Sequence, residues 1–337
     1  MLRAGIIGLG KMGLSHASIL GAHPLVELVG LCDTSGLVLE AFKKFSKVNV
    51  YDDFRKMIDS ERLDFVVVAS PTKFHYEMVK YALNRGIHTF CEKPFSLTIQ
   101  EGGELVELAQ RKYVVNQAGF HNHFIGTFRE LKRLLASGVL GELVHFTGEA
   151  YGPVVVREKG EPWRSDPKEG GGCLFDYASH VINLIQEIVG KPVKASGSQL
   201  KKIYSKKVED AVYSILTLEN GLTGVLSVNW SDETYRKMST SLMVMGKKGK
   251  IICDATELKI YLKQANPKEN LDKGWTIKYI TDLAIPVNFY LRGEEYSAQI
   301  DYFVECILKN KQTEINSFEQ ALRTDKVIDL IIEDSKN

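Results

Sequence analysis

The chain has 337 residues, of which 44% are hydrophobic and 25% are charged. This is the composition of an ordinary globular protein, and the length exceeds what one hydrophobic core usually fills, so we expect two domains. Lys and Arg number 43 against 42 Asp and Glu, which leaves no basic excess for a phosphate backbone or an anionic bilayer. We therefore expect neither nucleic acid nor a membrane as a partner.

The apolar segments and the cysteines indicate the compartment. The longest apolar runs, such as residues 66–69, are too short to span a bilayer, and the N-terminus lacks the segments of a secretion signal. The five cysteines are odd in number and widely spaced, which argues against disulfides and structural zinc. We expect a cytoplasmic protein without a metal site.

Residues 1–120 alternate short apolar runs with helical periodicity. This alternation predicts a parallel sheet wrapped by crossover helices, that is, a doubly wound α/β Rossmann domain that binds a dinucleotide. The expected strands are residues 3–8, 26–32, 65–70, 88–91 and 113–116. The expected helices are residues 13–21, 37–45, 74–84 and 99–111.

The pattern of helical and extended segments in residues 121–337 predicts a second, α+β domain with a large, mostly antiparallel open sheet. A helix at 124–136 and a strand at 142–151 are followed by a long irregular segment at 152–172 and a helix at 173–189. Extended segments then recur at 193–203, 211–219, 222–230, 239–246, 250–253 and 258–263. Turns at 219–221 and 246–249 predict hairpins, and helices at 297–309 and 318–333 complete the domain.

The clearest motif is Gly8-Leu9-Gly10-Lys11-Met12-Gly13, which follows the first expected strand and opens the first expected helix. In this context G-x-G-x-x-G is a dinucleotide-binding fingerprint. Gly8 permits a tight turn, Gly10 lets the backbone approach a pyrophosphate, and Gly13 allows close packing of helix on strand. The N–H groups at the start of the helix attract the phosphates, so the motif is expected to bind the cofactor, Lys11 and Met12 included.

Asp33 stands at the end of the second expected strand, twenty residues beyond Gly13. Its carboxylate can accept hydrogen bonds from the adenosine ribose hydroxyls and would repel a 2′-phosphate. Residues 34–37 include no Arg that could bind such a phosphate. The expected cofactor is NAD, with NADP less favoured.

Three further segments carry reactive side chains: residues 69–75, the Glu-Lys-Pro tripeptide at 92–94, and residues 170–180, with three glycines followed by Asp-x-x-x-His. Together with the fingerprint, they resemble the glucose-fructose oxidoreductase, inositol dehydrogenase and MocA family over almost the whole chain. The resemblance implies a dehydrogenase that oxidises a secondary hydroxyl of a sugar, cyclitol or nucleotide sugar, or reduces the ketone.

The resemblance assigns catalytic roles to Lys93, Asp176 and His180. The chemistry agrees, because moving a hydride from a carbinol carbon to nicotinamide requires the hydroxyl proton to leave toward a base. Histidine titrates near neutrality, and Lys93, at the carboxyl end of a strand, can polarise the substrate oxygen. Asp176 lies four residues before His180, on the same helix face, where it can orient the imidazole. Whether Lys93 or His180 accepts the proton stays open.

The resemblance also implies further binding residues. The expected cofactor contacts outside the fingerprint are Asp33, Ser70, Thr72, His75 and Glu92. The expected substrate contacts are Lys93, Trp163, Arg164, Asp176, Tyr177 and His180, and His123 is added because it stands in a stretch that departs from the family. Two positions are ambiguous, since His75 could equally be an ordinary surface histidine that opens a helix and Tyr177 could merely pack. Residues 119–124 depart from the family, because histidines stand where many relatives carry arginines.

Two other functions fit the same fold. An NAD-dependent glycosidase would oxidise its sugar transiently and reduce the product again with the same groups. A dinucleotide-sensing regulatory protein would usually lack part of the catalytic set, whereas Lys93, Asp176 and His180 are all present. Net turnover of external NAD would separate a glycosidase from the sugar or polyol dehydrogenase that we expect.

The C-terminal sheet predicts a homodimer or homotetramer. Residues 211–219 carry apolar side chains on both alternations, so both faces of the strand require burial. Only two helices are expected after residue 190, too few to cover both faces of a large sheet. Packing two such sheets face to face about a two-fold axis would bury the remainder.

Overall fold

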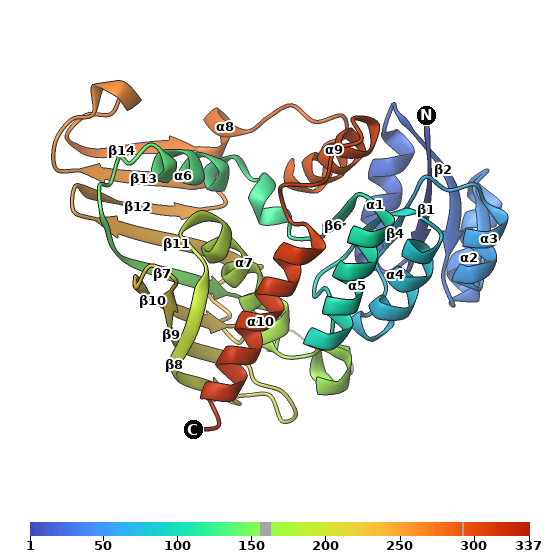
Figure 1. The fold of residues 1–337 in the computed structure, drawn as a ribbon, viewed down its shortest axis with the longest axis horizontal. Helices are drawn as coiled ribbons and strands as arrows, with labels where there is room; N and C mark the ends of the chain where they lie inside the picture. Colours follow the sequence, from blue (N-terminus) through green and yellow to red (C-terminus); the bar gives the residue numbers. More distant parts are fainter. Residues whose placement is uncertain (156–162, 292) are drawn as a thin grey trace. The chain divides into compact units, whose positions relative to one another are not determined.

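The computed structural model of the protein describes residues 1–155, 163–291 and 293–337. The chain forms two compact units (Figure 1). The first consists of Met1–His121 and Pro286–Leu322, and the second of Asn122–Ile285 and Arg323–Asn337. The expected boundary after residue 120 falls one residue before the end of the first segment. Residues 286–322, which we expected in the second domain, cluster with the first unit instead.

The first unit is built on a parallel sheet of six strands, as the sequence predicts. The strands are β1 (Leu2–Ile7), β2 (Val26–Cys32), β3 (Asn49–Tyr51), β4 (Phe65–Val68), β5 (His88–Cys91) and β6 (Asn116–Ala118). Their order is β3-β2-β1-β4-β5-β6, so the chain reverses direction across the sheet between β1 and β4. In open parallel sheets ligands bind outside the carboxyl ends of the strands at such a reversal.

Helices cover both faces of this sheet. They are α1 (Lys11–Ala22), α2 (Gly36–Phe45), α3 (Phe54–Ser60), α4 (His75–Asn84), α5 (Ile99–Lys112) and α9 (Glu295–Leu308). In β4, Phe65 and Val67 pack with side chains of α1 and α9, whereas Val66 and Val68 pack with those of α3, α4 and α5. All four are fully buried, which is why the strand reads as a continuous apolar run.

Three elements of the first unit differ from the sequence expectation. β3 and α3 were not predicted, because three and seven residues are too few to show a period. The last strand occupies 116–118 rather than 113–116, because Tyr113 adopts a left-handed conformation (φ 52°) where α5 ends.

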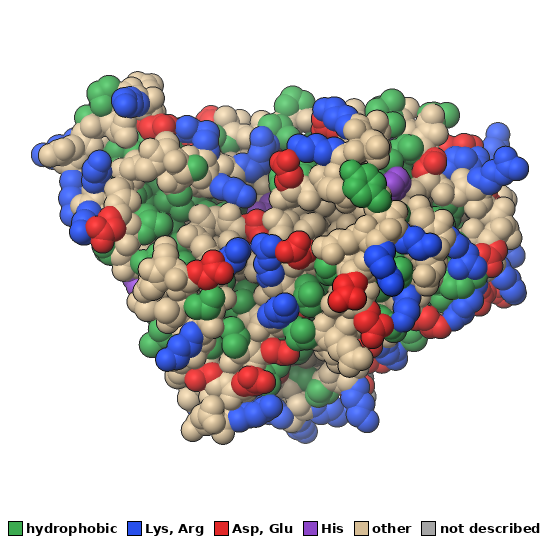
Figure 2. All heavy atoms as spheres, viewed as in Figure 1, with side chains coloured by type: hydrophobic (Ala, Val, Ile, Leu, Met, Phe, Trp, Pro, Cys, Tyr) green, Lys and Arg blue, Asp and Glu red, His purple; other side chains and the backbone are tan. Residues whose placement is uncertain are grey.

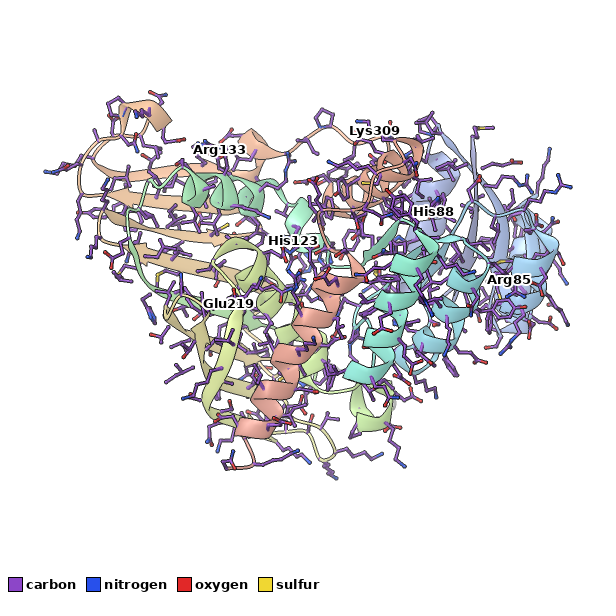
Figure 3. The ribbon with its side chains drawn as sticks, viewed as in Figure 1. Arg85, His88, His123, Arg133, Glu219 and Lys309 are labelled. Carbon is purple, nitrogen blue, oxygen red and sulfur yellow. The ribbon has the colours of Figure 1, made fainter. Side chains whose placement is uncertain are left out.

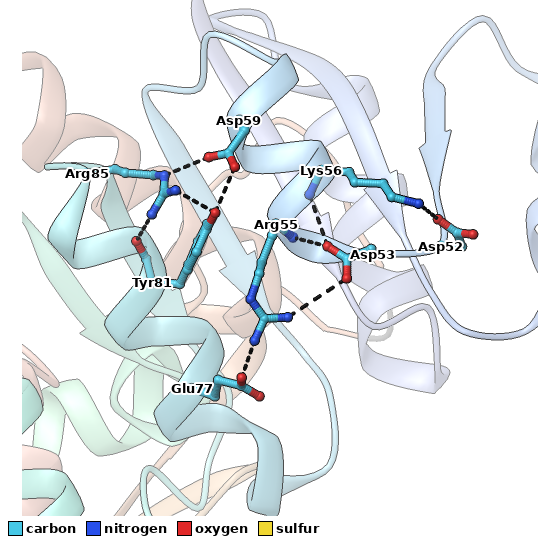
Figure 4. Close-up of polar contacts among 8 residues, drawn as sticks. All are labelled: Asp52, Asp53, Arg55, Lys56, Asp59, Glu77, Tyr81 and Arg85. Atoms are coloured by element: carbon cyan, nitrogen blue, oxygen red, sulfur yellow. Dashed lines mark hydrogen bonds and ion pairs between the residues drawn. The ribbon is translucent and has the colours of Figure 1, made fainter.

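Side-chain contacts fix α3 against α4 on the surface of the unit (Figure 4). The Asp53 carboxylate accepts hydrogen bonds from the Arg55 and Lys56 N–H groups at the start of α3. At the other end of α3, Asp59 accepts from the Tyr81 hydroxyl and from Arg85 Nε, both at 2.7 Å. Such exposed pairs each contribute little to stability, so their role is mainly to set how the two helices align.

The second unit is built on the predicted large sheet. Its strands are β7 (Leu143–Tyr151), β8 (Pro192–Lys201), β9 (Ala211–Leu218), β10 (Thr223–Asn229), β11 (Ser239–Gly246), β12 (Gly249–Asp254), β13 (Glu257–Leu262) and β14 (Gly274–Tyr279). Their order is β14-β13-β12-β11-β7-β10-β9-β8, with antiparallel pairing except between β7 and β10. Both predicted hairpins, β9–β10 and β11–β12, are present. The edge strand β14 was not predicted.

Helices cover one face of this sheet. They are α6 (Gly126–Ala136), α7 (Ser179–Ile188), the short α8 (Ile280–Leu283), and α10 (Phe318–Asp334), whose residues up to Leu322 belong to the first unit. Side chains of α6, α7 and the second half of α10 share one hydrophobic cluster with the strands. The helix expected at 173–189 is a π-helical turn, Leu174–Ala178, that leads into α7.

The opposite face of the large sheet carries apolar side chains that the described part of the chain leaves exposed. In β9, Val212 and Leu216 are buried toward the helices, whereas Tyr213 and Ile215 are 38% and 49% exposed. In β14, Trp275 and Ile277 are 54% and 45% exposed. The prediction from sequence that helices cover only part of this sheet matches these exposures.

Charged side chains of both signs are interspersed on the molecular face that Figure 2 shows. Within the described ranges, no helix is sufficiently long and apolar to cross a membrane. All five cysteines are buried free thiols.

Candidate active site

The predicted site residues fall into two sets, one in each unit. The glycine loop, Asp33, residues 70–75 and residues 92–93 belong to the first unit. His123, Trp163, Arg164, Asp176, Tyr177 and His180 belong to the second.

The glycine loop between β1 and α1 has the geometry of a phosphate-binding turn. Gly8 adopts φ +91°, and a Cβ there would lie 2.7 Å from the backbone nitrogen of Ser70. A Cβ on Gly13 would lie 1.8 Å from the Gly8 carbonyl oxygen, so helix and strand pack too closely for any other residue. A Cβ on Gly10, in contrast, would meet no described atom within 4 Å. The loop is closed toward the protein and open on the side where a pyrophosphate would approach the start of α1.

Asp33 lies directly beside this loop. Its Oδ2 accepts a hydrogen bond from the Leu9 N–H at 2.6 Å, and its Oδ1 accepts one from the Ser35 N–H at 2.8 Å. Each oxygen has a second lone pair, so the carboxylate can still accept from ribose hydroxyls while the backbone holds its orientation. The residues therefore fit a dinucleotide, and Asp33 lies beside the loop at the end of β2.

His75, at the start of α4, is buried between two loops. Its Nδ1 lies 2.9 Å from the Pro94 carbonyl oxygen, and its Nε2 lies 2.8 Å from that of Ser70. Burial lowers the pKa of His75, although the two carbonyl oxygens act against that shift. The alternative that His75 is an ordinary surface histidine is wrong. The ring ties the loop after β4, which includes the buried Thr72, to the segment that carries Lys93.

Glu92 and Lys93 follow β5, two strands from the glycine loop. The Glu92 carboxylate is turned into the protein, where Oε1 lies 2.7 Å from Nε2 of the fully buried His16. Its Oε2 accepts from the Lys93 backbone N–H at 3.3 Å, and the Lys93 side chain is half-buried. Burial raises the pKa of Glu92, but the hydrogen bond from His16 and the charges of His16, His121 and Lys93 outweigh it, and the net pKa is lowered. The sequence did not indicate His16, because nothing in a helix pattern shows which strand end the side chain meets.

In the second unit the π-helical turn brings Asp176 to Arg164. Arg164 Nε donates to Asp176 Oδ2 at 2.8 Å, and Asp176 is only 3% exposed. The Arg164 carbonyl oxygen in turn accepts from the Gly172 N–H at 3.0 Å. Arg164 was expected to contact substrate, and in the structure it is the ion-pair partner of Asp176. Trp163 lies in the short turn Trp163–Ser165, and its side chain lies outside the described part of the structure.

The neighbours of Asp176 on this segment are buried as well. His180, at the start of α7, is 3% exposed, and Tyr177 is 6% exposed with its ring edge-on to Trp230. Burial raises the pKa of Tyr177 above its usual range, so the phenol stays protonated. The packing on Trp230 fits the alternative that Tyr177 has a structural role.

Glu209, in the loop before β9, holds the start of the π-helical turn. Its Oε1 accepts from the Leu174 N–H at 2.9 Å, and its carbonyl oxygen accepts from the Cys173 N–H at 3.1 Å. A Cβ on Gly172, which adopts φ +109°, would lie 2.2 Å from Glu209 Oε1. The third glycine is therefore required because the carboxylate occupies the space of a side chain. Burial raises the pKa of Glu209. Sequence reasoning missed this residue, since its contact spans 35 positions of the chain.

His123, labelled in Figure 3, is part of a buried polar chain that includes α7. Its Nε2 lies 2.6 Å from Asn183 Oδ1, and Asn183 Nδ2 donates to Thr324 Oγ1 at 3.2 Å. Gln186 Nε2 donates to the same hydroxyl at 3.0 Å. Burial lowers the pKa of His123 to about 4, so the ring is neutral at pH 7 and donates through Nε2. Asn183 is one turn of α7 beyond His180, so this chain of hydrogen bonds fixes the helix that carries the predicted catalytic histidine.

Among the described residues, no three His, Cys, Asp or Glu side chains are grouped so that they could hold a metal ion.

Comparison with known proteins identifies the family. The model of an oxidoreductase family with an NAD-binding Rossmann fold, GFO/IDH/MocA, matches residues 2–120, and the model of the GFO/IDH/MocA C-terminal domain matches residues 128–252. D-glucoside 3-dehydrogenase of Escherichia coli K12 is 30% identical over 256 residues, which covers 69% of this chain and 70% of that one. The chain belongs to the GFO/IDH/MocA oxidoreductase family. The predicted family and the NAD-binding Rossmann domain are thereby confirmed.

Other GFO/IDH/MocA proteins are similar over most of their length. Myo-inositol 2-dehydrogenase of Thermotoga maritima is 27% identical over 259 residues, which covers 75% of each chain. The solved structure of levoglucosan dehydrogenase in complex with NADH and L-sorbose is 21% identical, covers 100% of this chain and 97% of that one, and has a TM-score of 0.89. At 21% identity, this structural similarity shows that the two proteins share a fold. These relatives are dehydrogenases, so the glycosidase and regulatory alternatives are not favoured.

Proposed function

We propose that this protein is an NAD-dependent dehydrogenase that oxidises a secondary hydroxyl of a sugar or cyclitol, or reduces the corresponding ketone. The observation that carries the proposal is the edge formed by the carboxyl ends of β1, β2, β4 and β5. There the open glycine loop, Asp33 and Lys93 follow neighbouring strands of one parallel sheet. The glucoside and inositol dehydrogenases among the relatives support this class of substrate.

The proposed chemistry needs a base for the hydroxyl proton and a cation beside the substrate oxygen. When bound, NAD supplies the carbon that accepts the hydride. Lys93 polarises the substrate oxygen, and His180 or Lys93 receives its proton. Asp176 is held by Arg164 at 2.8 Å in the turn that precedes His180.

A panel of substrates tests this proposal. Methyl glucosides, free sugars, myo-inositol and nucleotide sugars are each incubated with the protein and NAD, and formation of NADH is followed by absorbance. We expect net NADH formation with at least one sugar or cyclitol. A glycosidase would instead release an aglycone without net NADH, and that result would refute the proposal.

We further propose that Asp33 selects NAD over NADP. Its carboxylate is fixed by the Leu9 and Ser35 N–H groups at the place where a 2′-phosphate would have to lie, and like charges repel there. Dissociation constants measured by fluorescence titration should be at least about tenfold lower for NADH than for NADPH. Equal or tighter binding of NADPH would contradict this assignment.

The exposed face of the large sheet supports a homo-oligomer. Tyr213, Ile215, Trp275 and Ile277 lie on this face, opposite α6 and α7, and monomeric proteins seldom leave so much apolar surface exposed. We propose that two copies pack these faces together, as a dimer or as part of a tetramer.

A further inference from the structure

A buried acid–base pair connects the glycine-loop helix with the segment of Lys93. His16 lies on α1, one turn after Lys11–Gly13, and is fully buried. Its Nε2 lies 2.7 Å from Glu92 Oε1, and its ring packs edge-on against Phe90 of β5 at 5.2 Å. Both contacts lie within the first unit, so they depend only on the Rossmann sheet.

The pair has a defined hydrogen-bond direction. A carboxylate can only accept a hydrogen bond, so His16 Nε2 carries a hydrogen and donates a hydrogen bond to Glu92 Oε1. The other oxygen, Oε2, accepts from the Lys93 backbone N–H, and Gly119 leaves room for it, since a Cβ on Gly119 would lie 2.6 Å from that atom. Glu92 is thus oriented from three sides, by α1, by its own strand end and by the segment after β6.

The orientation of the Glu92 carboxylate matters for Lys93 because the carboxylate carries a negative charge next to it. The cationic or titratable groups that face the Glu92 carboxylate are His16 from α1, His121 from the segment after β6, and Lys93 itself. A buried carboxylate requires compensation, because burial without a partner is costly. If His16 no longer donates to it, the carboxylate loses the contact that fixes Oε1 and can turn toward His121 and Lys93.

We propose that His16 is a positioning residue for the reaction. By donating Nε2–H to Glu92, it holds the carboxylate in the orientation in which Oε2 accepts from the Lys93 backbone N–H, and so fixes the segment that carries Lys93 relative to the start of α1. This inference rests on the proposed function of Lys93 and extends it to a residue of the cofactor-binding helix.

Two similar substitutions separate positioning from mere structure. In His16→Gln the amide nitrogen can occupy the place of Nε2 and still donate to Glu92, whereas in His16→Asn the shorter side chain cannot reach it. Both replace a buried ring by a buried amide, so their effects on folding should be alike. His23→Asn is the matched control, because His23 ends the same helix and lies 3.2 Å from Asp301 in a second His–carboxylate pair far along α1 from the glycine loop.

The primary measurement is the rate at which acetic anhydride acetylates Lys93, followed by peptide mass spectrometry as a function of pH in the full-length protein. We expect His16→Asn to slow the acetylation of Lys93 about tenfold at a given pH, because a carboxylate that His16 no longer holds brings its negative charge closer to the ammonium group. His16→Gln and His23→Asn should behave like the wild type. NADH titration of each variant serves as the check that the cofactor site has formed.

Two results would overturn the inference. One is an unchanged pH dependence in His16→Asn. The other is an equal change in His16→Gln and His16→Asn, which would mean that His16 only fills space. Neither result bears on the proposed function itself, which is tested separately by the substrate panel and by hydride transfer in Lys93→Met and His180→Ala.

Discussion

His123 shows how burial decides the state of a single residue. The sequence identified it as a pocket candidate because it departs from the family pattern, and the structure places it in a hydrogen-bonded chain with Asn183 and Thr324. Burial lowers its pKa to about 4, so the native state holds it neutral. An unfolded histidine titrates near 6.5.

Between pH 6.5 and about 4 the unfolded chain therefore binds a proton at His123 that the folded chain does not. The stability that the neutral His123 contributes is fully present above pH 6.5. As the pH falls from 6.5 to about 4, the free energy of unfolding decreases by on the order of 3 kcal/mol because of this residue. In His123→Gln, which keeps a donor for Asn183, urea denaturation should show a correspondingly smaller loss of stability. Burial also lowers the pKa values of His75 and His88. Their contribution to the pH dependence of stability is the same in the wild type and in His123→Gln. An identical pH dependence in the two proteins would contradict this account of His123.

The sequence predicted the residues whose role depends on local geometry. Gly8, Gly13 and Asp33 could be assigned because a strand, a turn and a helix follow one another within a short segment. His16 and Glu209 could not, because their partners Glu92 and Leu174 lie 76 and 35 positions away. A buried histidine in a helix and an acid in a loop look ordinary until the fold shows what they contact.

At the scale of an element, the π-helical turn Leu174–Ala178 is the feature that the sequence could not predict. It replaces the first turn of the helix expected at 173–189 and presents Asp176 to Arg164. Turns of this kind occur often at functional sites. Its first N–H groups are satisfied by Glu209, from a loop distant in the sequence, rather than by a local capping residue.

Removal of this carboxylate should disturb the reaction more than it disturbs folding. We expect Glu209→Ala to lower the free energy of unfolding by about 1–2 kcal/mol and hydride transfer by about tenfold or more, since a misplaced catalytic group is costly. The NADH dissociation constant should not change. Asp53→Ala, which removes the acceptor at the start of α3, is the matched control and should cost about 1 kcal/mol without a change in rate. Equal rates in the two variants would argue against a role for Glu209 in the site.

Short and peripheral elements account for the remaining differences between prediction and structure. β3, α3 and the edge strand β14 carry too few residues or too much exposure to produce a clear period. The long buried strands and helices were predicted within a few residues. The return of residues 286–322 to the first unit was missed, because α9 reads as an ordinary amphipathic helix whichever sheet it covers.

For the whole molecule, the exposed sheet face predicts assembly. Light scattering at micromolar concentration should give a mass that is a multiple of the 37.8 kDa chain. Ile277→Lys, on the outer face of β14, should reduce that mass, because a charge would be buried against the partner copy. Leu37→Lys, at an 81% exposed position on α2 of the first unit, should leave it unchanged. A wild-type mass equal to one chain would contradict the proposed packing.

The most direct test of the proposed function separates chemistry from cofactor binding. Single turnovers of the wild type, Lys93→Met and His180→Ala are followed by stopped flow with a substrate identified in the panel, after NADH titration of each protein. We predict that both substitutions slow hydride transfer by about a hundredfold or more while the NADH dissociation constant stays within about threefold, because these groups act on the substrate in the transition state. Near-normal hydride transfer in both variants would contradict the account.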